Sequence, residues 1–141
     1  MGSMRLTRVY HASAGHRLES GALTAEENAR VYGPCYGQHG HNYLIEVTVA
    51  GETDPATGMA LDLGIVDAAV QATVLSRIDH RDLSSAVPEL AGTVTTGEEL
   101  ARIFWEWLAP ALPPGALRRV GVVETAKNAF ACHGPDGDDE P

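Results

Sequence analysis

Three histidines in the first third of the chain have the residue type and spacing that suit a metal ion. His39 and His41 are separated by one residue at the start of an alternating apolar stretch, and His16 follows an earlier stretch of this kind. Side chains two positions apart in a strand lie on one face, roughly 6.5 Å apart, so both imidazoles can bind one ion. With His16 they would form the three-nitrogen set that leaves one position of a zinc ion open to a substrate. The alternative is a set of surface or core histidines with ordinary hydrogen-bond partners.

Cys35, four positions before His39, allows two interpretations. As a fourth ligand it would close the coordination sphere and make the zinc site structural. As a nearby unbound thiol it would be a base or nucleophile, because a cation lowers the pKa of a thiol. The residues alone leave both open.

Two further polar groups could move protons or bind a ligand. Asp79 precedes His80 directly after a predicted helix, and a carboxylate beside an imidazole can fix its tautomer for proton transfer. The alternative for this pair is a solvated helix C-terminus, where a histidine favourably meets the helix dipole. Glu124 ends an apolar strand on its apolar face, where a carboxylate either anchors a ligand or pairs with a cation.

The elements that must position these residues follow from the spacing of apolar side chains. Alternation of apolar and polar residues predicts strands over four segments: residues 5–13, 42–50, 117–125 and 129–133. Helical spacing predicts two longer helices, one over residues 63–78 with Asp62 as its N-cap and one that follows a capping box at Thr96 and stops at Pro110. A second capping box at Thr24 predicts a short helix before Gly33.

This order of elements indicates an α+β fold. Short connections favour antiparallel pairing, so we expect a four-stranded antiparallel sheet with two helices on one face. Such a sheet has two open edges, and association of subunits through them is one way to cover them.

Composition limits the class of protein and its partners. The chain has 141 residues, 44% of them apolar, which suits one domain, predicted over residues 4–134. Residues 1–3 read as an expression scar, and residues 135–141 as an acidic tail that cannot bury enough surface to fold. We find no apolar run long enough for a membrane span and no secretory signal, so we expect a cytoplasmic protein with free thiols.

The net charge of −9 disfavours nucleic acid and anionic membrane surfaces as partners. A phosphorylated substrate would therefore need a local positive site, which a bound dication could supply.

Six motifs, in order along nearly the whole chain, resemble the 6-pyruvoyl-tetrahydropterin synthase family. They are Ser13-Ala14-Gly15-His16-Arg17-Leu18, Cys35-x-x-x-His39-Gly40-His41-Asn42-Tyr43, residues 51–59, Ile78-Asp79-His80-x-x-Leu83, Thr96-x-Glu98 and Glu124-Thr125. The chain departs from the family pattern at Ala12, where an aromatic residue is usual, and at Glu99, where asparagine is usual. The spacing of three residues between Cys35 and His39 resembles that of the bacterial 6-carboxytetrahydropterin synthases instead.

The resemblance implies a T-fold (tunnelling fold), in which subunits join edge to edge into a barrel. Two trimers commonly stack as a homohexamer with active sites between subunits. This implication agrees with the element order and with the open sheet edges.

The resemblance also implies a role for each candidate residue. His16, His39 and His41 would bind Zn²⁺. Cys35 would be the catalytic thiol, and Asp79 with His80 would complete the proton-transfer set. Glu124 would hold the pterin ring, and the motif of Thr96 and Glu98 would contribute to substrate binding.

The implied activity is a zinc-dependent carbon–oxygen lyase that converts 7,8-dihydroneopterin triphosphate to 6-pyruvoyl-tetrahydropterin with loss of triphosphate. Three alternatives remain at this point: 6-carboxytetrahydropterin synthesis for the queuosine pathway, aldol cleavage of the dihydroneopterin side chain, and a non-catalytic pterin-binding zinc module.

Overall fold

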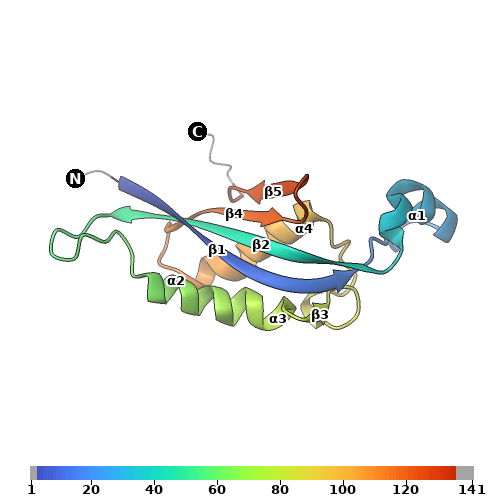
Figure 1. The fold of residues 1–141 in the computed structure, drawn as a ribbon, viewed down its shortest axis with the longest axis horizontal. Helices are drawn as coiled ribbons and strands as arrows, with labels where there is room; N and C mark the ends of the chain where they lie inside the picture. The colour runs from blue at the N-terminus through green and yellow to red at the C-terminus, as the bar shows by residue number, and fades with distance from the viewer. Residues whose placement is uncertain (1–2, 136–141) are drawn as a thin grey trace.

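Two long strands form the centre of the molecule (Figure 1). In the computed structural model, which describes residues 3–135, β1 (Ser3–His16) and β2 (His39–Glu52) pair antiparallel along their whole length. The register sets Ser3 opposite Glu52 and His16 opposite His39. This pairing alone brings two of the three candidate ligands together at one end of the sheet.

The sheet has five strands in the order β3-β1-β2-β4-β5. β4 (Leu117–Val123) pairs antiparallel with β2, and β5 (Ala129–Cys132) pairs antiparallel with β4. The four predicted strands are all present, and β1 extends beyond the predicted residues 5–13 at both ends, beginning within the residues read as an expression scar. The additional strand, β3 (Arg81–Asp82), pairs parallel with β1 at Ala14 and Gly15. A strand of two residues has no period that the sequence could reveal.

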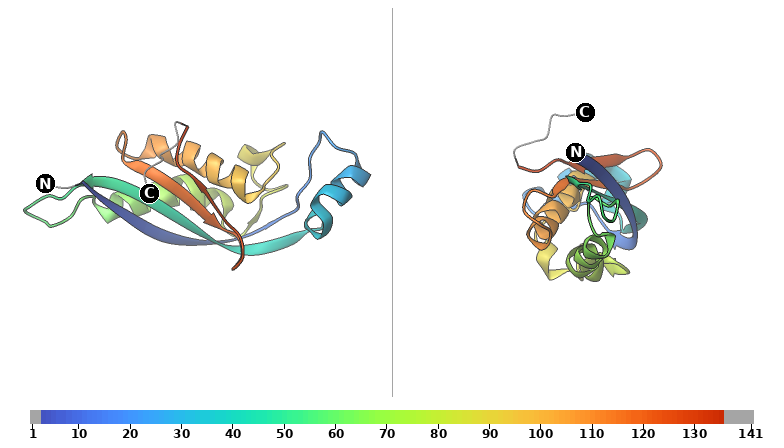
Figure 2. Two further views of the ribbon diagram at one scale, coloured as in Figure 1. Left: turned by 90° about the horizontal axis from the view of Figure 1, so that it is seen from above. Right: turned by 90° about the vertical axis from the view of Figure 1, so that its left-hand side faces the viewer.

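Two helical segments cover one face of this sheet, as predicted (Figure 2). The first is continuous and consists of α2 (Leu63–Val70), a π-helical turn (Gln71–Leu75) and α3 (Ser76–Ile78). The second is α4 (Gly97–Leu108). A further helix, α1 (Ala25–Tyr32), stands beyond the end of the β1–β2 pair (Figure 1).

Three single turns of 3₁₀-helix complete the fold: Gly33–Tyr36, Pro88–Leu90 and Ala109–Ala111. Within residues 3–135, no helix is long and apolar enough to cross a bilayer. Residues 136–141 of the predicted tail lie outside the described part of the chain.

The core lies between the sheet and the helices because apolar side chains alternate on the strands and recur at helical spacing. Those at its centre are fully or almost fully buried: Tyr43, Ile45, Val47 and Val49 on β2, Val66 and Val70 on α2, and Leu100, Phe104 and Leu108 on α4.

The predicted helix caps differ in completeness. Asp62 accepts from the N–H of Gly64 at 2.8 Å, and Thr24 forms both bonds of a capping box with Glu27. At α4 only half of the box is present. The Thr96 hydroxyl accepts from the N–H of Glu99, whereas the Glu99 carboxylate binds Arg102.

Candidate metal centre

Three imidazoles converge where β1 ends and β2 begins. One nitrogen from each of His16, His39 and His41 lies within 4.8 Å of the other two. The ring centroids are 4.5 to 5.0 Å apart. His16 is fully buried, and the other two are partly buried. The strand register and the two-residue period explain this convergence, because all three side chains lie on the face that the helices cover.

Two of the rings are oriented through their Nδ1 atoms. Nδ1 of His16 lies 3.1 Å from both the carbonyl oxygen and the hydroxyl of Thr95, which is itself buried. Nδ1 of His39 lies 2.7 Å from the carbonyl oxygen of Gly37. Because a carbonyl only accepts, each Nδ1 carries the proton and each Nε2 is left with a free lone pair. Metal-binding histidines usually donate from the other ring nitrogen to an oxygen in this way, which fixes the ring and its tautomer.

Burial favours the neutral form of His16 and His41. It lowers the pKa of His16 to about 4, with the neighbouring imidazoles of His39 and His41 contributing in the same direction. Burial also lowers the pKa of His41, although the carboxylate of Glu124 opposes that effect. A neutral imidazole is the form that binds a metal.

Glu124, directly after β4, faces the same centre. Its Oε1 lies 3.2 Å from Nε2 of His41 and 3.7 Å from Nε2 of His16. Tyr43 approaches from the core side, with its hydroxyl 3.5 Å from Nε2 of His16. Burial, and next the charge of Glu124, raise the pKa of Tyr43, so its hydroxyl remains protonated.

The donor set fits a divalent cation. Nε2 of His41 is buried and has no hydrogen-bond partner among the described residues, and its contact with Glu124 lacks hydrogen-bond geometry. A buried imidazole nitrogen without a hydrogen-bond partner, 3.2 Å from a carboxylate oxygen, is available as a ligand atom, and a cation held there would also face the carboxylate. Three imidazole nitrogens beside one carboxylate suit zinc with an open position.

Cys35 lies outside the group of three histidines. It is exposed, on the 3₁₀ turn that follows α1, and its carbonyl oxygen accepts from the N–H of Leu18 at 2.8 Å. The sulfur does not belong to the set of ligand atoms within 4.8 Å of one another. This placement favours a nearby thiol over a fourth ligand.

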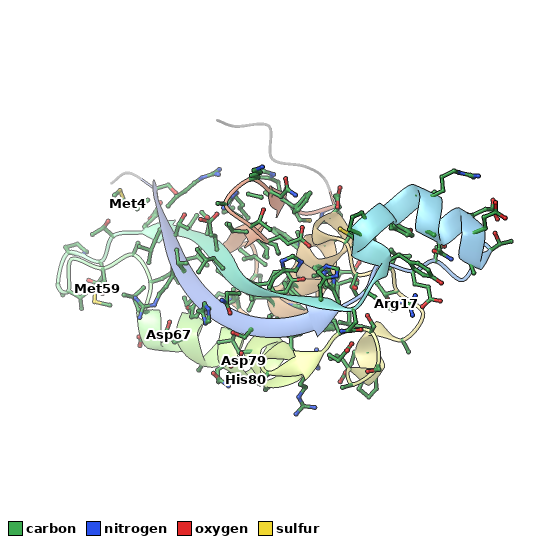
Figure 3. All side chains as sticks on the ribbon, turned by 45° about the vertical axis from the view of Figure 1, so that its right-hand side comes forward. Met4, Arg17, Met59, Asp67, Asp79 and His80 are labelled. Carbon is green, nitrogen blue, oxygen red and sulfur yellow. The ribbon has the colours of Figure 1, made fainter. Side chains whose placement is uncertain are left out.

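Asp79 and His80 lie together beside the outer edge of β1 (Figure 3). Nδ1 of His80 is 3.0 Å from Oδ1 of Asp79, and the N–H of Ser13 donating to Asp79 lowers the pKa of that carboxyl. His80 has a left-handed backbone, with φ of 61°, and an exposed side chain. Strained conformations of this kind cluster at functional sites. His80 and His41 both line a shallow hollow of about 380 Å³.

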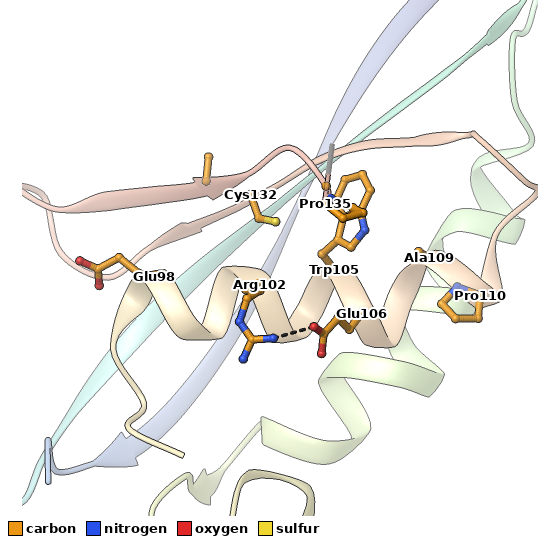
Figure 4. A pocket seen from close by; sticks show the side chains of 10 residues that line it. Glu98, Arg102, Trp105, Glu106, Ala109, Pro110, Cys132 and Pro135 are labelled. Carbon is orange, nitrogen blue, oxygen red and sulfur yellow. Dashed lines mark hydrogen bonds and ion pairs between the residues drawn. The ribbon is translucent and has the colours of Figure 1, made fainter. Parts of the chain in front are cut away.

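Thr96 and Glu98 lie at the N-terminus of α4, and neither belongs to the group of three histidines. The Thr96 hydroxyl caps α4, and Glu98 lines a groove of about 570 Å³ between α4 and β5 (Figure 4). Trp105 and Cys132 line the same groove, and none of the three histidines does.

Comparison with known proteins agrees with this geometry. A family model described as 6-pyruvoyl tetrahydropterin synthase matches residues 5–135. The chain belongs to this family. Among its relatives, 6-pyruvoyl tetrahydrobiopterin synthase of Poecilia reticulata is 42% identical over 132 residues, covering 92% of this chain and 89% of the relative. A 6-carboxy-5,6,7,8-tetrahydropterin synthase of Aquifex aeolicus is 27% identical, covering 86% and 88%.

Solved structures of the 6-pyruvoyl tetrahydropterin synthase family share the fold. That of the Caenorhabditis elegans enzyme superposes with a TM-score of 0.90 at 36% identity, covering 95% of this chain and 97% of the other. The T-fold implied by the motifs is therefore the fold of this chain.

Tyr43 and Thr95, two residues that contact His16, were assigned no role from the sequence. Tyr43 lies two positions after His41, and the same alternation that groups the histidines places it on their face, so period-two reasoning could have found it. Thr95 carries no comparable signal. It reaches His16 only because the N-terminus of α4 packs against the end of β1.

Proposed function

We propose that this protein is a zinc-dependent carbon–oxygen lyase that converts 7,8-dihydroneopterin triphosphate to 6-pyruvoyl-tetrahydropterin with loss of triphosphate. The single observation that carries the proposal is the convergence of three imidazoles, with one nitrogen of each within 4.8 Å of the others, in a chain of the 6-pyruvoyl tetrahydropterin synthase family.

Similarity supports this product over 6-carboxytetrahydropterin. Relatives named 6-pyruvoyl tetrahydrobiopterin synthase are 37–42% identical to the chain, whereas the relative named for the 6-carboxy product is 27% identical. The spacing between Cys35 and His39 is the one feature that favours the 6-carboxy enzymes.

His16, His39 and His41 would hold the zinc ion through nitrogen. When bound, zinc supplies a Lewis acid that binds the side-chain hydroxyls of the pterin and acidifies the adjacent C–H. The carbonyl oxygens of Thr95 and Gly37 accept from Nδ1 of His16 and His39 and so leave the Nε2 lone pairs of these two rings free to bind the ion. Burial excludes water on the side of His16.

Cys35 would remove the proton from the acidified carbon as a thiolate. His80, oriented by Asp79, would return a proton to the pterin during the internal redox steps that precede triphosphate loss. The exposure of Cys35 and of the His80 side chain supports these two roles, since both side chains must reach a substrate that approaches from outside the core.

The carboxylate of Glu124 would accept hydrogen bonds from the paired N–H groups of the pterin ring. Its position beside the histidines would put the ring next to the ion. Thr96 and Glu98 would contribute from a neighbouring part of the substrate site, as the family motif implies.

A homohexamer of two trimers, with active sites between subunits, accords with the open edges of the sheet. β3 pairs with β1 only at Ala14 and Gly15, and the described residues contain no other strand on that side of β1. β5 forms the opposite edge. Edge pairing of β1 with β5 of a neighbouring subunit would close a barrel and cover both edges.

The test is incubation of the zinc-loaded protein with 7,8-dihydroneopterin triphosphate, followed by identification of the products. We expect stoichiometric triphosphate and 6-pyruvoyl-tetrahydropterin. Acetaldehyde would identify the 6-carboxy reaction, and glycolaldehyde would identify aldol cleavage. Absence of all of these from a zinc-loaded, folded sample would reject a catalytic role.

A further inference from the structure

Arg17 joins the end of β1 to the turn that carries Cys35. Its Nε–H donates to the carbonyl oxygen of Tyr36 at 3.0 Å, and its guanidinium carbon lies 4.2 Å from the centre of the Tyr36 ring. The next residue, Leu18, donates its N–H to the carbonyl oxygen of Cys35 at 2.8 Å. Three contacts thus hold this turn against the two residues that follow His16.

The main chain of Arg17 is fixed from the opposite side. Its N–H donates to the hydroxyl of Ser84 at 2.9 Å, and the same hydroxyl donates to its carbonyl oxygen at 3.3 Å. Ser84 follows β3, which pairs with β1. Figure 3 shows Arg17 beyond the end of β1, on the side of α1. The side chain therefore reaches out from an anchored main chain.

The turn also leads into the metal centre. Tyr36 is followed by Gly37, whose N–H donates to Pro34 at 3.1 Å and whose carbonyl oxygen orients His39. Arg17 follows His16 directly in the chain. The Arg17 side chain therefore links the end of β1, which supplies His16, to the turn that carries Cys35 and orients His39.

We propose that Arg17 is a positioning residue that fixes the thiol of Cys35 relative to the three histidines. The proposal rests on the proposed function, in which Cys35 is the base. An arginine suits this role because its planar guanidinium stacks on a ring while its Nε–H donates in the same plane. A lysine keeps the charge and can approach the ring or the carbonyl oxygen, but its ammonium lacks the planar group that stacks on the ring and donates in one fixed geometry.

The test compares Arg17→Lys with the parent protein in a Cys132→Ser background, in which Cys35 is the only thiol. Bound zinc, kcat, KM and the pH dependence of Cys35 alkylation by iodoacetamide are measured on zinc-loaded protein. We expect zinc content to be unchanged and kcat to fall by about tenfold or more, with a smaller change in KM, because a small misplacement of a reacting group is costly. The midpoint of the alkylation profile should move to higher pH, because in the proposed function the bound cation lowers the pKa of the thiol and a loosened turn weakens that effect.

A matched control is Arg77→Lys, because Arg77 also stacks on an aromatic ring, with its guanidinium carbon 4.7 Å from the Trp107 ring, but on a different part of the molecule. It should leave every readout unchanged. Tyr36→Phe keeps both the ring and the carbonyl oxygen and should behave as the parent. Tyr36→Ala removes the ring and should reproduce the effect of Arg17→Lys. Agreement between the two variants would show that the effect does not come from a folding defect in one of them.

Each outcome bears on the proposal. An Arg17→Lys variant with parental kcat and an unchanged alkylation midpoint would overturn it, as would loss of zinc, which would assign Arg17 to assembly of the metal centre. A fall in kcat with an unmoved alkylation midpoint would also reject a role through the thiol. If the parent shows no turnover but the midpoint still shifts in Arg17→Lys, the positioning role stands and the proposed function fails.

Discussion

Oε1 of Glu124 and Nε2 of His41 lie 3.2 Å apart without a hydrogen bond between them. Burial lowers the pKa of His41, against the charge of Glu124, and so disfavours a protonated imidazole that would neutralise the carboxylate. A cation bound by the histidines would place a positive charge beside this carboxylate. This carboxylate should therefore raise the affinity of the site for a metal ion, and the Glu124→Gln substitution should lower that affinity.

For Glu124→Gln we expect zinc affinity to fall by roughly tenfold, as is usual when a residue beside a metal ligand is replaced. The amide can donate to His41 in the metal-free protein and carries no charge. Turnover should fall further, since the pterin loses a charged acceptor. Zinc affinity can be measured by competition with a chromogenic chelator.

The control is Glu46→Gln, which removes a carboxylate that pairs with Arg119 within the sheet. It should leave zinc affinity unchanged. Equal loss of affinity in both variants would attribute the effect to net charge and contradict the local explanation.

Thr95→Val tests the support of His16. The substitution removes the hydroxyl 3.1 Å from Nδ1 but keeps the carbonyl oxygen, so the tautomer is retained while the ring loses one of two contacts. We expect a loss of about 1 kcal/mol in the free energy of unfolding and a several-fold weaker zinc affinity, up to the roughly tenfold typical of such partners.

Thr48→Val is the comparison for that experiment, because Thr48 is also buried and its hydroxyl bonds to that of Thr7 at 2.7 Å. It should lower stability by a similar amount in urea unfolding and leave zinc affinity alone. If Thr95→Val weakens stability but not zinc affinity, the threonine serves only the fold.

The buried His16 should make the metal-free protein sensitive to acid. Burial lowers its pKa from 6.5 to about 4 in the folded state, so between these two pH values the unfolded chain binds more protons than the folded one. Stability is therefore greatest above pH 6.5 and falls as the pH is lowered toward 4, by roughly 3 kcal/mol if only this group contributes. Urea unfolding of chelator-treated protein at several pH values measures the slope.

In His16→Gln this contribution to the slope should disappear, because the substituted side chain does not titrate. A variant that keeps the full pH dependence would assign the acid sensitivity to other groups.

Much of the histidine arrangement could be predicted from the sequence because it depends on local rules. Alternation along β2 places His39, His41 and Tyr43 on one face, and a strand that ends at His16 has to meet β2 if the two pair. The N-caps at Asp62 and Thr24 follow equally local preferences and are present.

What the sequence did not predict depends on packing between distant segments. β3 has two residues and exists because the chain after α3 returns to the edge of β1. Thr95 contacts His16 across 79 positions. Glu98 shares a family motif, yet it lines the groove beside β5 and not the histidine centre of its own chain. The spacing of apolar residues along the sequence does not predict contacts of this kind.

Gly97 at the start of α4 lies against the ring of Phe130 on β5, and a Cβ added there would overlap three atoms of that ring. Gly97→Ala should therefore push Phe130 outward and lower the free energy of unfolding by about 1–3 kcal/mol, the usual cost of overpacking. Urea unfolding measures the loss. Gly21→Ala, where no atom lies within 4 Å of the added Cβ, should be close to neutral, and an equal loss at both positions would contradict a packing explanation.

Cys35→Ala separates the two interpretations of the thiol. Because the sulfur is outside the group of three ligand nitrogens and the residue is exposed, removing it should leave one zinc ion per chain and a parental melting temperature. Turnover should fall by at least about a hundredfold, the lower range for loss of a general base. Metal analysis after gel filtration and a triphosphate-release assay give the two readouts, with Cys132→Ala as the control that should keep both. Loss of zinc together with activity in Cys35→Ala would instead make the thiol a fourth ligand and the site structural, because a closed coordination sphere leaves no position for a pterin oxygen.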